Sequence, residues 1–321
     1  MKSFSPSTIQ NELSTFESKF SASVSSNVPL LDRIMRYIIK RKGKQIRPMF
    51  VFLSAKMHGE INESSYRAAS LVELLHTATL VHDDVVDESM QRRGFFSINA
   101  IWKNKIAVLV GDYLLSKGLL LSIEHNEFQQ LHILSDAVRK MSEGELLQLE
   151  KSRSLNLDEQ VYFDIIRQKT ASLVASACGV GAFSTSQDLD TTRKMMEFGE
   201  LVGMAFQIKD DLFDYGDAKI GKPTGNDIRE KKLTLPLIYT INHADKTLKK
   251  RLIYILRNKN KEKSQVNFVI DTVKNMGGLD YANNKMLEFQ RDAIKILHEF
   301  PENNVRNELE SLVNYTIERK H

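Results

Sequence analysis

The sequence contains a single cysteine, Cys178, among its 321 residues. One cysteine excludes an internal disulfide framework and a cysteine-based zinc cluster, and it suits a reducing compartment. The opening residues MKSFSPSTIQNEL lack the apolar core of a signal peptide, and no run of about 18 apolar residues predicts a transmembrane segment. Neither charge dominates, because 45 Lys and Arg against 41 Asp and Glu leave a net charge of +4. We therefore expect a cytoplasmic protein whose composition calls for no nucleic-acid partner.

Proline is absent between positions 49 and 222, because all six prolines lie outside that stretch. Proline breaks helix interiors, so this gap favours long helices. Apolar residues recur at helical spacing, as in Leu71, Leu74, Leu75 and Ala78, and Asn-Gly or Asp-Gly hairpin signals are absent. No linker rich in Pro, Gly or Ser divides the chain. The sequence predicts an all-α bundle folded as one domain over residues 1–321.

An acidic motif ends one of the apolar helical runs. In LVHDDVVDESMQRRG, Asp83 and Asp87 are four residues apart and share a helix face, with Asp84 beside them. Carboxylates on one face repel each other unless cations lie between them, and Mg²⁺ prefers oxygen ligands that it shares with substrate phosphates. Taken alone, the motif fits an acidic helix end equally well.

The same spacing recurs in FQIKDDLFDYGD as Asp210, Asp211 and Asp214, after a second helical apolar run. Two carboxylate triplets on long helices indicate a shared metal cluster. Such a cluster neutralises a polyphosphate and stabilises a departing phosphate by electrostatic and Lewis-acid catalysis.

Basic residues accompany both triplets. Arg92 and Arg93 follow the first triplet closely, and Lys44 and Arg47 lie in RKGKQIRP. Arginine offers a diphosphate two parallel contacts, and lysine offers a point charge. For any one lysine, a solvated surface position is the more common outcome. Further basic candidates and a hydroxyl are Lys169 with Thr170, Lys222 in IGKPTG and Lys232 in EKKLTLP.

Together, these motifs resemble the trans-type (head-to-tail) polyprenyl diphosphate synthases. The resemblance covers most of the chain, through GKQIRP, ELLHTATLVHDDVVD, RRG, GDYLL, RQKT, FQIKDDLFD, GKPTGND and KLTLPLIY. It implies an all-α bundle around a deep central cavity, usually a homodimer, that extends an allylic diphosphate with isopentenyl diphosphate. Two departures occur. The usual GGK reads Lys42-Gly43-Lys44, and Phe95 and Phe96 follow RRG where a basic residue and a proline are common.

The resemblance also implies roles for individual residues. The six aspartates would bind about three Mg²⁺ ions. The implied isopentenyl diphosphate site comprises Lys44, Arg47, His76 and Arg93. The implied contacts to the allylic diphosphate come from Arg92, Lys169, Thr170, Gln207, Lys222 and Lys232. By residue type alone, His76 among leucines is more often a buried core histidine.

The implied reaction is ionisation, condensation and elimination. The allylic diphosphate ionises, the double bond of isopentenyl diphosphate attacks the cation, and released pyrophosphate removes the proton. The hydroxyl of Thr170 and the amide of Gln207 would stabilise the cation as fixed dipoles.

Residues before Asp83 predict the length of the product. A helix rises about 1.5 Å per residue, so each turn of about 5.4 Å passes roughly one isoprene unit. Ala78 and Thr79 are small, whereas short-chain members of the family place an aromatic plug there, and Leu75 lies a further turn back. We therefore expect a product longer than C20, of about C30 to C40.

Other functions remain as alternatives. A short-chain farnesyl or geranylgeranyl diphosphate synthase would share every motif of this chain and would differ by its aromatic plug. A class I terpene cyclase shares an aspartate-rich helix and Mg²⁺, but its second motif is normally of an Asn/Ser/Glu type, unlike Asp210, Asp211 and Asp214. An inactive regulatory subunit should have lost its first aspartates or its arginines, and this chain keeps both.

One basic stretch lies outside these motifs. Between Lys246 and Lys263, eight basic residues accompany a single acid, Glu262. The stretch is able to bind an anionic surface, although a solvated helix face is the simpler interpretation. The predicted partners are therefore the two diphosphate substrates and a second copy of the chain. We predict no nucleic acid and no transmembrane segment, and at most a peripheral membrane contact for product release.

Overall fold

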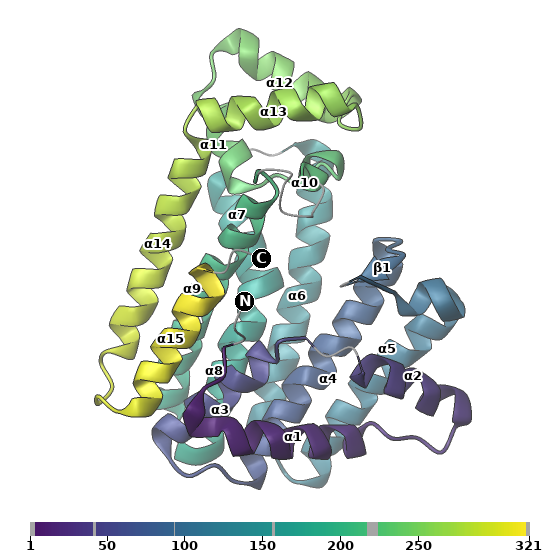
Figure 1. The fold of residues 1–321 in the computed structure, drawn as a ribbon, viewed down its shortest axis with the longest axis vertical. Helices are drawn as coiled ribbons and strands as arrows, with labels where there is room; N and C mark the ends of the chain where they lie inside the picture. The colour runs from purple at the N-terminus through teal and green to yellow at the C-terminus, as the bar shows by residue number, and fades with distance from the viewer. Residues whose placement is uncertain (1–3, 41–42, 93, 156–157, 217–223, 319–321) are drawn as a thin grey trace. The chain divides into compact units, whose positions relative to one another are not determined.

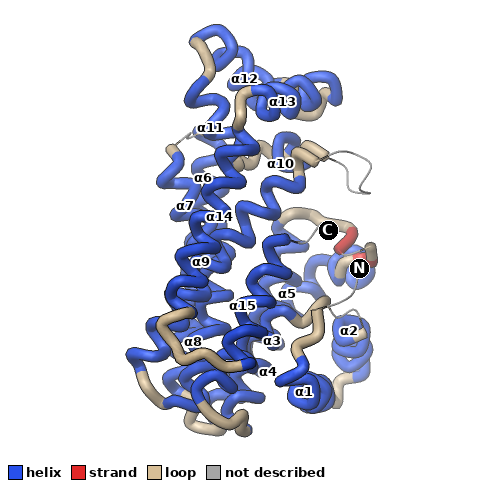
Figure 2. Tube along the Cα trace, turned by 60° about the vertical axis from the view of Figure 1, so that its left-hand side comes forward, coloured by secondary structure: helices blue, strands red, loops and turns tan. Residues whose placement is uncertain are grey.

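The structure is a computed structural model that describes residues 4–40, 43–92, 94–155, 158–216 and 224–318. Within these ranges the chain is helical apart from loops and one two-stranded hairpin (Figures 1 and 2). The predicted all-α fold class is therefore confirmed.

One compact unit, called unit 1, comprises Met1–Val138, Ser176–Met196 and Pro301–Leu309. Its long helices α4 and α5 pack side by side, and α1 and α3 pack against α4 (Figure 1). The elements that lie wholly in unit 1 are η1 (Ser7–Ile9), α1 (Gln10–Ser23), α2 (Pro29–Ile39), α3 (Ile46–His58), α4 (Glu63–Val86), β1 (Gln91–Arg92), β2 (Phe95–Phe96) and α5 (Ile98–Glu124).

A second compact unit, unit 2, comprises Arg139–Ala175, Glu197–Phe300 and Glu310–His321. Its helix α11 packs against α7, α12, α13 and α14. Buried Tyr215, Ile228 and Leu237 belong to its core. The elements that lie wholly in unit 2 are α7 (Glu159–Ile166), the π-helical turn η2 (Arg167–Ala171), α10 (Asn226–Arg229), α11 (Leu235–His243), α12 (Lys246–Asn258), α13 (Lys263–Asn275) and α14 (Gly278–Leu297).

Four further helices contain the boundaries between the two units in the chain. They are α6 (Phe128–Ser154), α8 (Ser172–Ser186), α9 (Leu189–Phe213) and α15 (Asn304–Glu318). The prediction of one domain over residues 1–321 stays a prediction.

The proline-free stretch forms the longest helices of the described chain, as predicted. Helices α4, α5, α6 and α9 contain 24, 27, 27 and 25 residues, and α5 has a kink at Lys103, whose φ of 73° is not helical. Helix α4 begins at a capping box, in which the side chain of Asn62 accepts the N–H of Ser65 and the side chain of Ser65 accepts the N–H of Asn62. Its apolar residues, including Leu71, Leu74 and Ala78, are buried. Local capping and helical periodicity together define this helix.

The small hairpin is a feature that the sequence did not predict. Gln91 pairs with Phe96 and Arg92 pairs with Phe95 in an antiparallel register. The turn contains Gly94 at a φ of 78°, a left-handed conformation that glycine adopts without strain. This turn uses neither Asn-Gly nor Asp-Gly, so the usual hairpin dipeptides do not mark it in the sequence.

Helix α5 bears on the predicted absence of a membrane span. Among the described residues, α5 alone is long and apolar enough to cross a membrane, by length and composition only. A single such helix is weak evidence, because the core helix of a soluble protein has the same features. The absence of a transmembrane segment therefore stays a prediction.

Candidate active site

The first aspartate triplet lies at the carboxyl end of α4. Asp83 and Asp84 are in the last turn, and Asp87 caps the helix by donating its N–H to the carbonyl of Asp83 at 2.8 Å. Asp84 is 4% exposed, Asp83 is half-buried and Asp87 is exposed. The helix dipole disfavours negative charge at this end, where a purely structural cap would use lysine or arginine. This position favours a ligand-binding role over the acidic-cap interpretation.

Arg92 binds the buried member of this triplet. Its Nε donates to Oδ1 of Asp84 at 2.7 Å, and Asn99 Nδ2 donates to the Asp84 carbonyl at 3.1 Å. Burial raises the pKa of Asp84, and the charge of Arg92 opposes that rise. A residue predicted to contact substrate therefore contacts an aspartate of the metal motif in this structure.

A pocket in unit 1 contains several predicted residues. His76, Asp84 and Arg92 line it together with the apolar side chains of Phe95 and Phe96. His76 is 7% exposed. The pocket therefore combines charged groups with aromatic rings.

Lys44 and Arg47 of the predicted isopentenyl diphosphate site come from the start of α3. Lys44 precedes α3 and is exposed, and Arg47 lies in the first turn of α3 and is half-buried. Neither is among the described residues that line the unit 1 pocket. Arg93 lies outside the described residues.

The three residues predicted to set product length lie on a face of α4 other than the one that lines the unit 1 pocket. Ala78 and Leu75 are buried, and Thr79 is half-buried with its hydroxyl donating to the His76 carbonyl at 2.9 Å. None of them is among the described residues that line the unit 1 pocket. Their role in product length stays a prediction.

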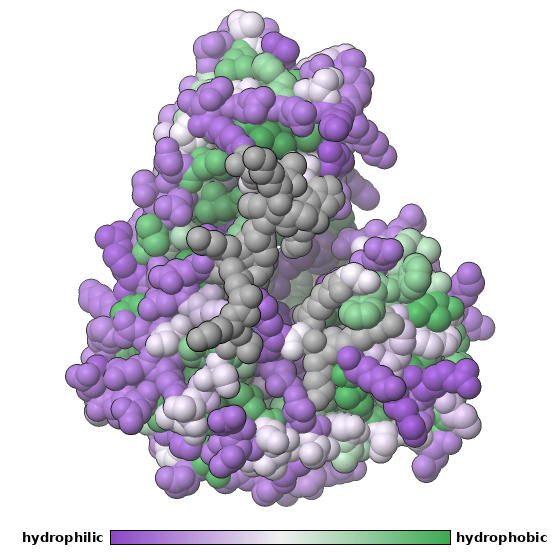
Figure 3. Space-filling model, in the orientation of Figure 1, coloured by the Kyte–Doolittle hydropathy of each residue, from purple (hydrophilic) through white to green (hydrophobic). Residues whose placement is uncertain are grey.

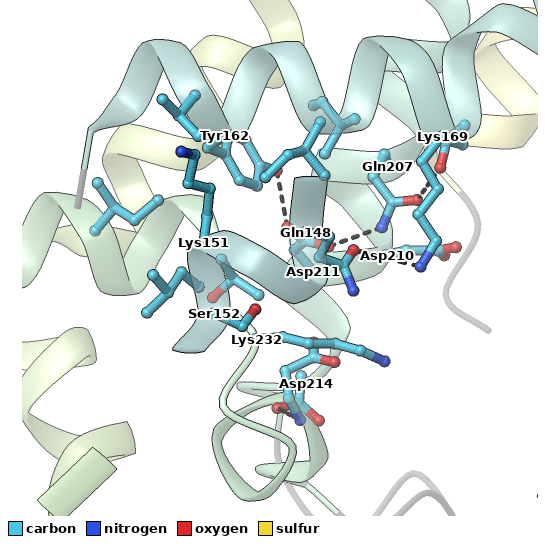
Figure 4. Close-up of a pocket in the computed structure, with 18 of the residues that line it drawn as sticks. Gln148, Lys151, Ser152, Tyr162, Lys169, Gln207, Asp210, Asp211, Asp214 and Lys232 are labelled. Atoms are coloured by element: carbon cyan, nitrogen blue, oxygen red, sulfur yellow. Dashed lines mark hydrogen bonds between the residues drawn. The ribbon is translucent and has the colours of Figure 1, made fainter. Parts of the chain in front are cut away.

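A larger cavity, of about 450 Å³, lies in unit 2 (Figure 4). The predicted residues that line it are Lys169, Thr170, Gln207, Asp210, Asp211, Asp214 and Lys232. Lys222 lies outside the described residues. Seven residues that span 64 positions of sequence therefore share one cavity within a single unit.

Asp211 is the most enclosed carboxyl of this cavity, at 6% exposure. Gln207 Nε2 donates to its Oδ1 at 2.9 Å and the Tyr162 hydroxyl donates to its Oδ2 at 2.8 Å (Figure 4). The Thr170 hydroxyl donates to Gln207 Oε1 at 2.7 Å, so the amide is fixed from both ends. Burial, with the nearby charge of Asp227, raises the pKa of Asp211 to about 8.

Asp214 accepts backbone donors from the segment that follows it. The N–H groups of Asn226 and Asp227 donate to its two carboxylate oxygens at 2.8 and 3.1 Å. Burial raises the pKa of Asp214, and these N–H groups oppose the rise. Its orientation is therefore set by the start of α10.

The two predicted lysines that line the cavity, Lys169 and Lys232, contact carboxylates. Lys169 lies in the π-helical turn η2, a type of turn that is frequent at functional sites, and it pairs with Glu145. Lys232 pairs with Glu230 at 2.6 Å. Both side chains are about a third exposed, so they reach solvent from the cavity wall.

Two polar residues among those that sequence reasoning missed in this cavity are Asp227 and Tyr162. Asp227 lines it, and burial with the neighbouring charge of Asp214 raises the Asp227 pKa to about 6. Its signal was available, because Asp227 closes the GKPTGND motif. Tyr162 offered no motif, since it contacts Asp211 from another helix.

The donor set of the cavity suits a hard divalent cation. Its acidic side chains offer only oxygen, and burial together with neighbouring acids raises the pKa values of Asp211 and Asp227, a cost that a bound cation would offset. Among the described residues, no group of three acidic, histidine or cysteine side chains is placed to hold a metal ion. The carboxylate oxygens fit Mg²⁺, which commonly completes its coordination with phosphate oxygens of a substrate.

Comparison with known proteins gives a consistent result. The polyprenyl synthetase family model matches residues 28–273. Heptaprenyl diphosphate synthase component 2 of Bacillus subtilis is 32% identical over 316 residues, covering 97% of this chain and 89% of the relative. A crystal structure of polyprenyl synthase from Caulobacter crescentus, complexed with calcium and isoprenyl diphosphate, covers both chains fully with a TM-score of 0.91 and 32% identity. The geranylgeranyl pyrophosphate synthase of Bacteroides thetaiotaomicron is 36% identical, with a TM-score of 0.83 and 97% of each chain covered.

Proposed function

This chain belongs to the polyprenyl synthetase family, and from that premise we propose that it extends an allylic diphosphate with isopentenyl diphosphate in a Mg²⁺-dependent, head-to-tail condensation. It is a prenyltransferase. The main support for the substrates is the unit 2 cavity, where Asp210, Asp211 and Asp214 line the same walls as Lys169 and Lys232. Carboxylates and ammonium groups around one cavity suit a diphosphate accompanied by divalent cations.

The residues of unit 2 would bind and activate the allylic diphosphate. Lys169 and Lys232 bind its oxygens, exchanging their present partners Glu145 and Glu230 for substrate. Mg²⁺ held by Asp210, Asp211 and Asp214 would supply charge neutralisation of the departing pyrophosphate. Thr170 and Gln207 present fixed dipoles at the cavity wall, which stabilise positive charge on the allylic carbons. The released pyrophosphate removes the proton after condensation.

The unit 1 pocket would receive isopentenyl diphosphate. His76 supplies a polar contact, and Phe95 and Phe96 supply an apolar wall for the isopentenyl group. Lys44, Arg47 and Arg93 complete the proposed set.

We propose a product longer than C20, of about C30 to C40. The small side chains of Ala78 and Thr79 support this length, as does the relative named for a heptaprenyl product. A geranylgeranyl product is the second candidate, because a similar structure belongs to a geranylgeranyl pyrophosphate synthase.

We also propose that the protein is a cytoplasmic homodimer that touches membranes only peripherally. Exposed Val108, Leu109, Leu119 and Leu120 give α5 an unpartnered apolar face, which a second copy would cover. Figure 3 shows hydrophobic surface gathered over the region of the hairpin and α5. Size-exclusion chromatography with light scattering tests the dimer, and a monomer at micromolar concentration would contradict it.

Product analysis tests the proposed reaction. The purified chain is incubated with isopentenyl diphosphate, an allylic primer and Mg²⁺, and the dephosphorylated products are separated by chain length. We expect a series of prenyl alcohols that ends beyond C20. Cyclised hydrocarbons would indicate a terpene cyclase, and an absence of any product would indicate an inactive subunit.

A further inference from the structure

The proposed reaction gives no role to one buried polar group beside the unit 2 cavity, the hydroxyl of Tyr162. Tyr162 lies on α7, lines the cavity and is 5% exposed. Its hydroxyl donates to Oδ2 of Asp211 at 2.8 Å (Figure 4). When Asp211 is ionised to bind a cation, this hydrogen bond is charge-assisted and is stronger than one between neutral groups.

Tyr162 differs from the other donor to Asp211 in its origin. Gln207, which donates to Oδ1, lies four residues earlier on the same helix as Asp211. Gln207 therefore moves with Asp211, whereas Tyr162 reaches it from α7. Tyr162 therefore links the carboxylate directly to a second element of unit 2.

The position of α7 is itself held at its first turn. The side chain of Asp158 caps α7 by accepting the N–H of Gln160 at 2.9 Å. The Tyr281 hydroxyl, from α14, donates to Oε1 of Glu159 at 2.7 Å. The ring of Tyr162 packs edge-on against Phe163, with 5.5 Å between the ring centroids. These contacts place the Tyr162 hydroxyl before any ligand binds.

We propose that Tyr162 is a positioning residue for the second aspartate motif. It holds the Asp211 carboxylate in the orientation in which the motif offers its oxygens to Mg²⁺ and diphosphate. The inference rests on the proposed function of the cavity, and it goes beyond that function by adding a residue that no sequence motif contains.

The test compares two tyrosine variants matched in chemistry. Tyr162→Phe removes the donor to Asp211. Tyr215→Phe removes another buried hydroxyl of the same unit, one that bonds the Thr234 hydroxyl at 2.6 Å. Both variants keep their ring and lose one oxygen, and their melting temperatures without ligand report any general loss of folding.

The first readout is the Mg²⁺ concentration for half-maximal chain extension. The second needs no catalysis and is the rise in melting temperature that Mg²⁺ with inorganic pyrophosphate gives over pyrophosphate alone. We expect Tyr162→Phe to raise the half-saturating Mg²⁺ concentration on the order of tenfold, as for loss of a hydrogen bond to a charged group. We expect it also to reduce the melting-temperature rise. Tyr215→Phe should leave both values near those of the unmodified protein.

A double-mutant cycle tests whether Tyr162 acts through Asp211. Asp211→Asn keeps the side-chain volume and should raise the Mg²⁺ requirement by itself. Adding Tyr162→Phe to Asp211→Asn should change the requirement by less than about twofold. The proposal would be overturned if the two substitutions raised the Mg²⁺ requirement by factors that multiply in the double variant. It would also be overturned by an Asp211→Asn variant with normal Mg²⁺ dependence, or by a Tyr162→Phe variant that matches Tyr215→Phe. If the unmodified protein fails to extend prenyl chains, the proposed function fails, while the melting-temperature readout still decides the role of Tyr162.

Discussion

The Nε atom of Arg92 lies 2.7 Å from Oδ1 of Asp84, so the buried carboxylate of the first aspartate motif has a guanidinium partner from the hairpin strand β1. Asp84 is almost fully enclosed, whereas the Arg92 side chain is about a third exposed. The ion pair therefore links the end of α4 to the hairpin that borders the unit 1 pocket.

Arg92→Ala should weaken both folding and substrate binding. The substitution leaves a buried carboxylate without its charged donor, which costs about 1 to 3 kcal/mol of folding free energy. It also removes a proposed contact to the allylic diphosphate and should raise the Michaelis constant for that substrate. Urea unfolding and steady-state kinetics measure the two effects, with Arg92→Lys as the conservative control. Unchanged stability would show that water replaces the guanidinium at Asp84.

The two substrates should depend on different lysines. Lys44→Ala should mainly raise the Michaelis constant for isopentenyl diphosphate, and Lys169→Ala that for the allylic substrate. Each change should correspond to about 1 to 3 kcal/mol, as expected for a charge-assisted contact. Varying one substrate at saturating levels of the other separates the constants. If Lys44→Ala affected only the allylic substrate, the assignment of the two sites would be reversed.

An aromatic side chain before the first motif should shorten the product. Ala78→Phe or Thr79→Tyr should end chains at about C15 to C20 while the first condensation continues, because a bulky ring in the proposed path of the growing chain leaves the metal ligands in place. Ala78 is fully buried and Thr79 is half-buried, so Thr79→Tyr is the variant less disruptive to packing. Chromatography of the dephosphorylated products measures the length. An unchanged product distribution in both variants would show that Ala78 and Thr79 do not limit the growing chain.

The unit 2 carboxyls should make the metal-free protein less stable as pH rises. Burial, with neighbouring acids, raises the pKa of Asp211 to about 8 and that of Asp227 to about 6, from an ordinary 3.8. Between pH 3.8 and the raised pKa of each group, the folded protein retains a proton that the unfolded chain has lost. The stability contribution of these groups is therefore complete below about pH 4 and is lost as pH rises through 6 and 8.

Asp211→Asn removes the larger of these two effects. We expect its stability relative to the unmodified protein to increase from pH 6 to pH 8, measured by urea unfolding without divalent metal. A difference that is constant or that shrinks over this range would contradict the buried, uncompensated state of Asp211.

Local sequence signals predicted most of the fold. Apolar spacing and the absence of proline between 49 and 222 predicted long helices, and α4 buries Leu71, Leu74 and Ala78 as that spacing requires. The hairpin escaped prediction, because two-residue strands give no alternating pattern and their turn depends on Gly94. Short elements of this kind depend on tertiary contacts, such as the bond of 2.6 Å from the Tyr37 hydroxyl to the Phe96 carbonyl.

The candidate site was predictable where its residues form a motif along the chain. The spacing of Asp210, Asp211 and Asp214 indicated one site, and all three line one cavity. The contact of Tyr162 with Asp211 joins residues 49 positions apart, on different helices. No periodicity or spacing encodes such a contact, since it depends on how α7 packs in unit 2.

We propose that this chain by itself joins isoprene units in a metal-dependent reaction. The ratio of pyrophosphate released to isopentenyl diphosphate incorporated tests this most directly. We predict a ratio of one in Mg²⁺, no release after chelation with EDTA, and a rate roughly a hundred to a thousand times lower in Asp83→Ala, because about 3 to 4 kcal/mol of electrostatic stabilisation is lost. Asp292→Ala, at an exposed position of α14, should behave as the unmodified protein. Pyrophosphate release without isopentenyl incorporation, or an Asp83→Ala variant with near-normal turnover at saturating Mg²⁺, would contradict the account.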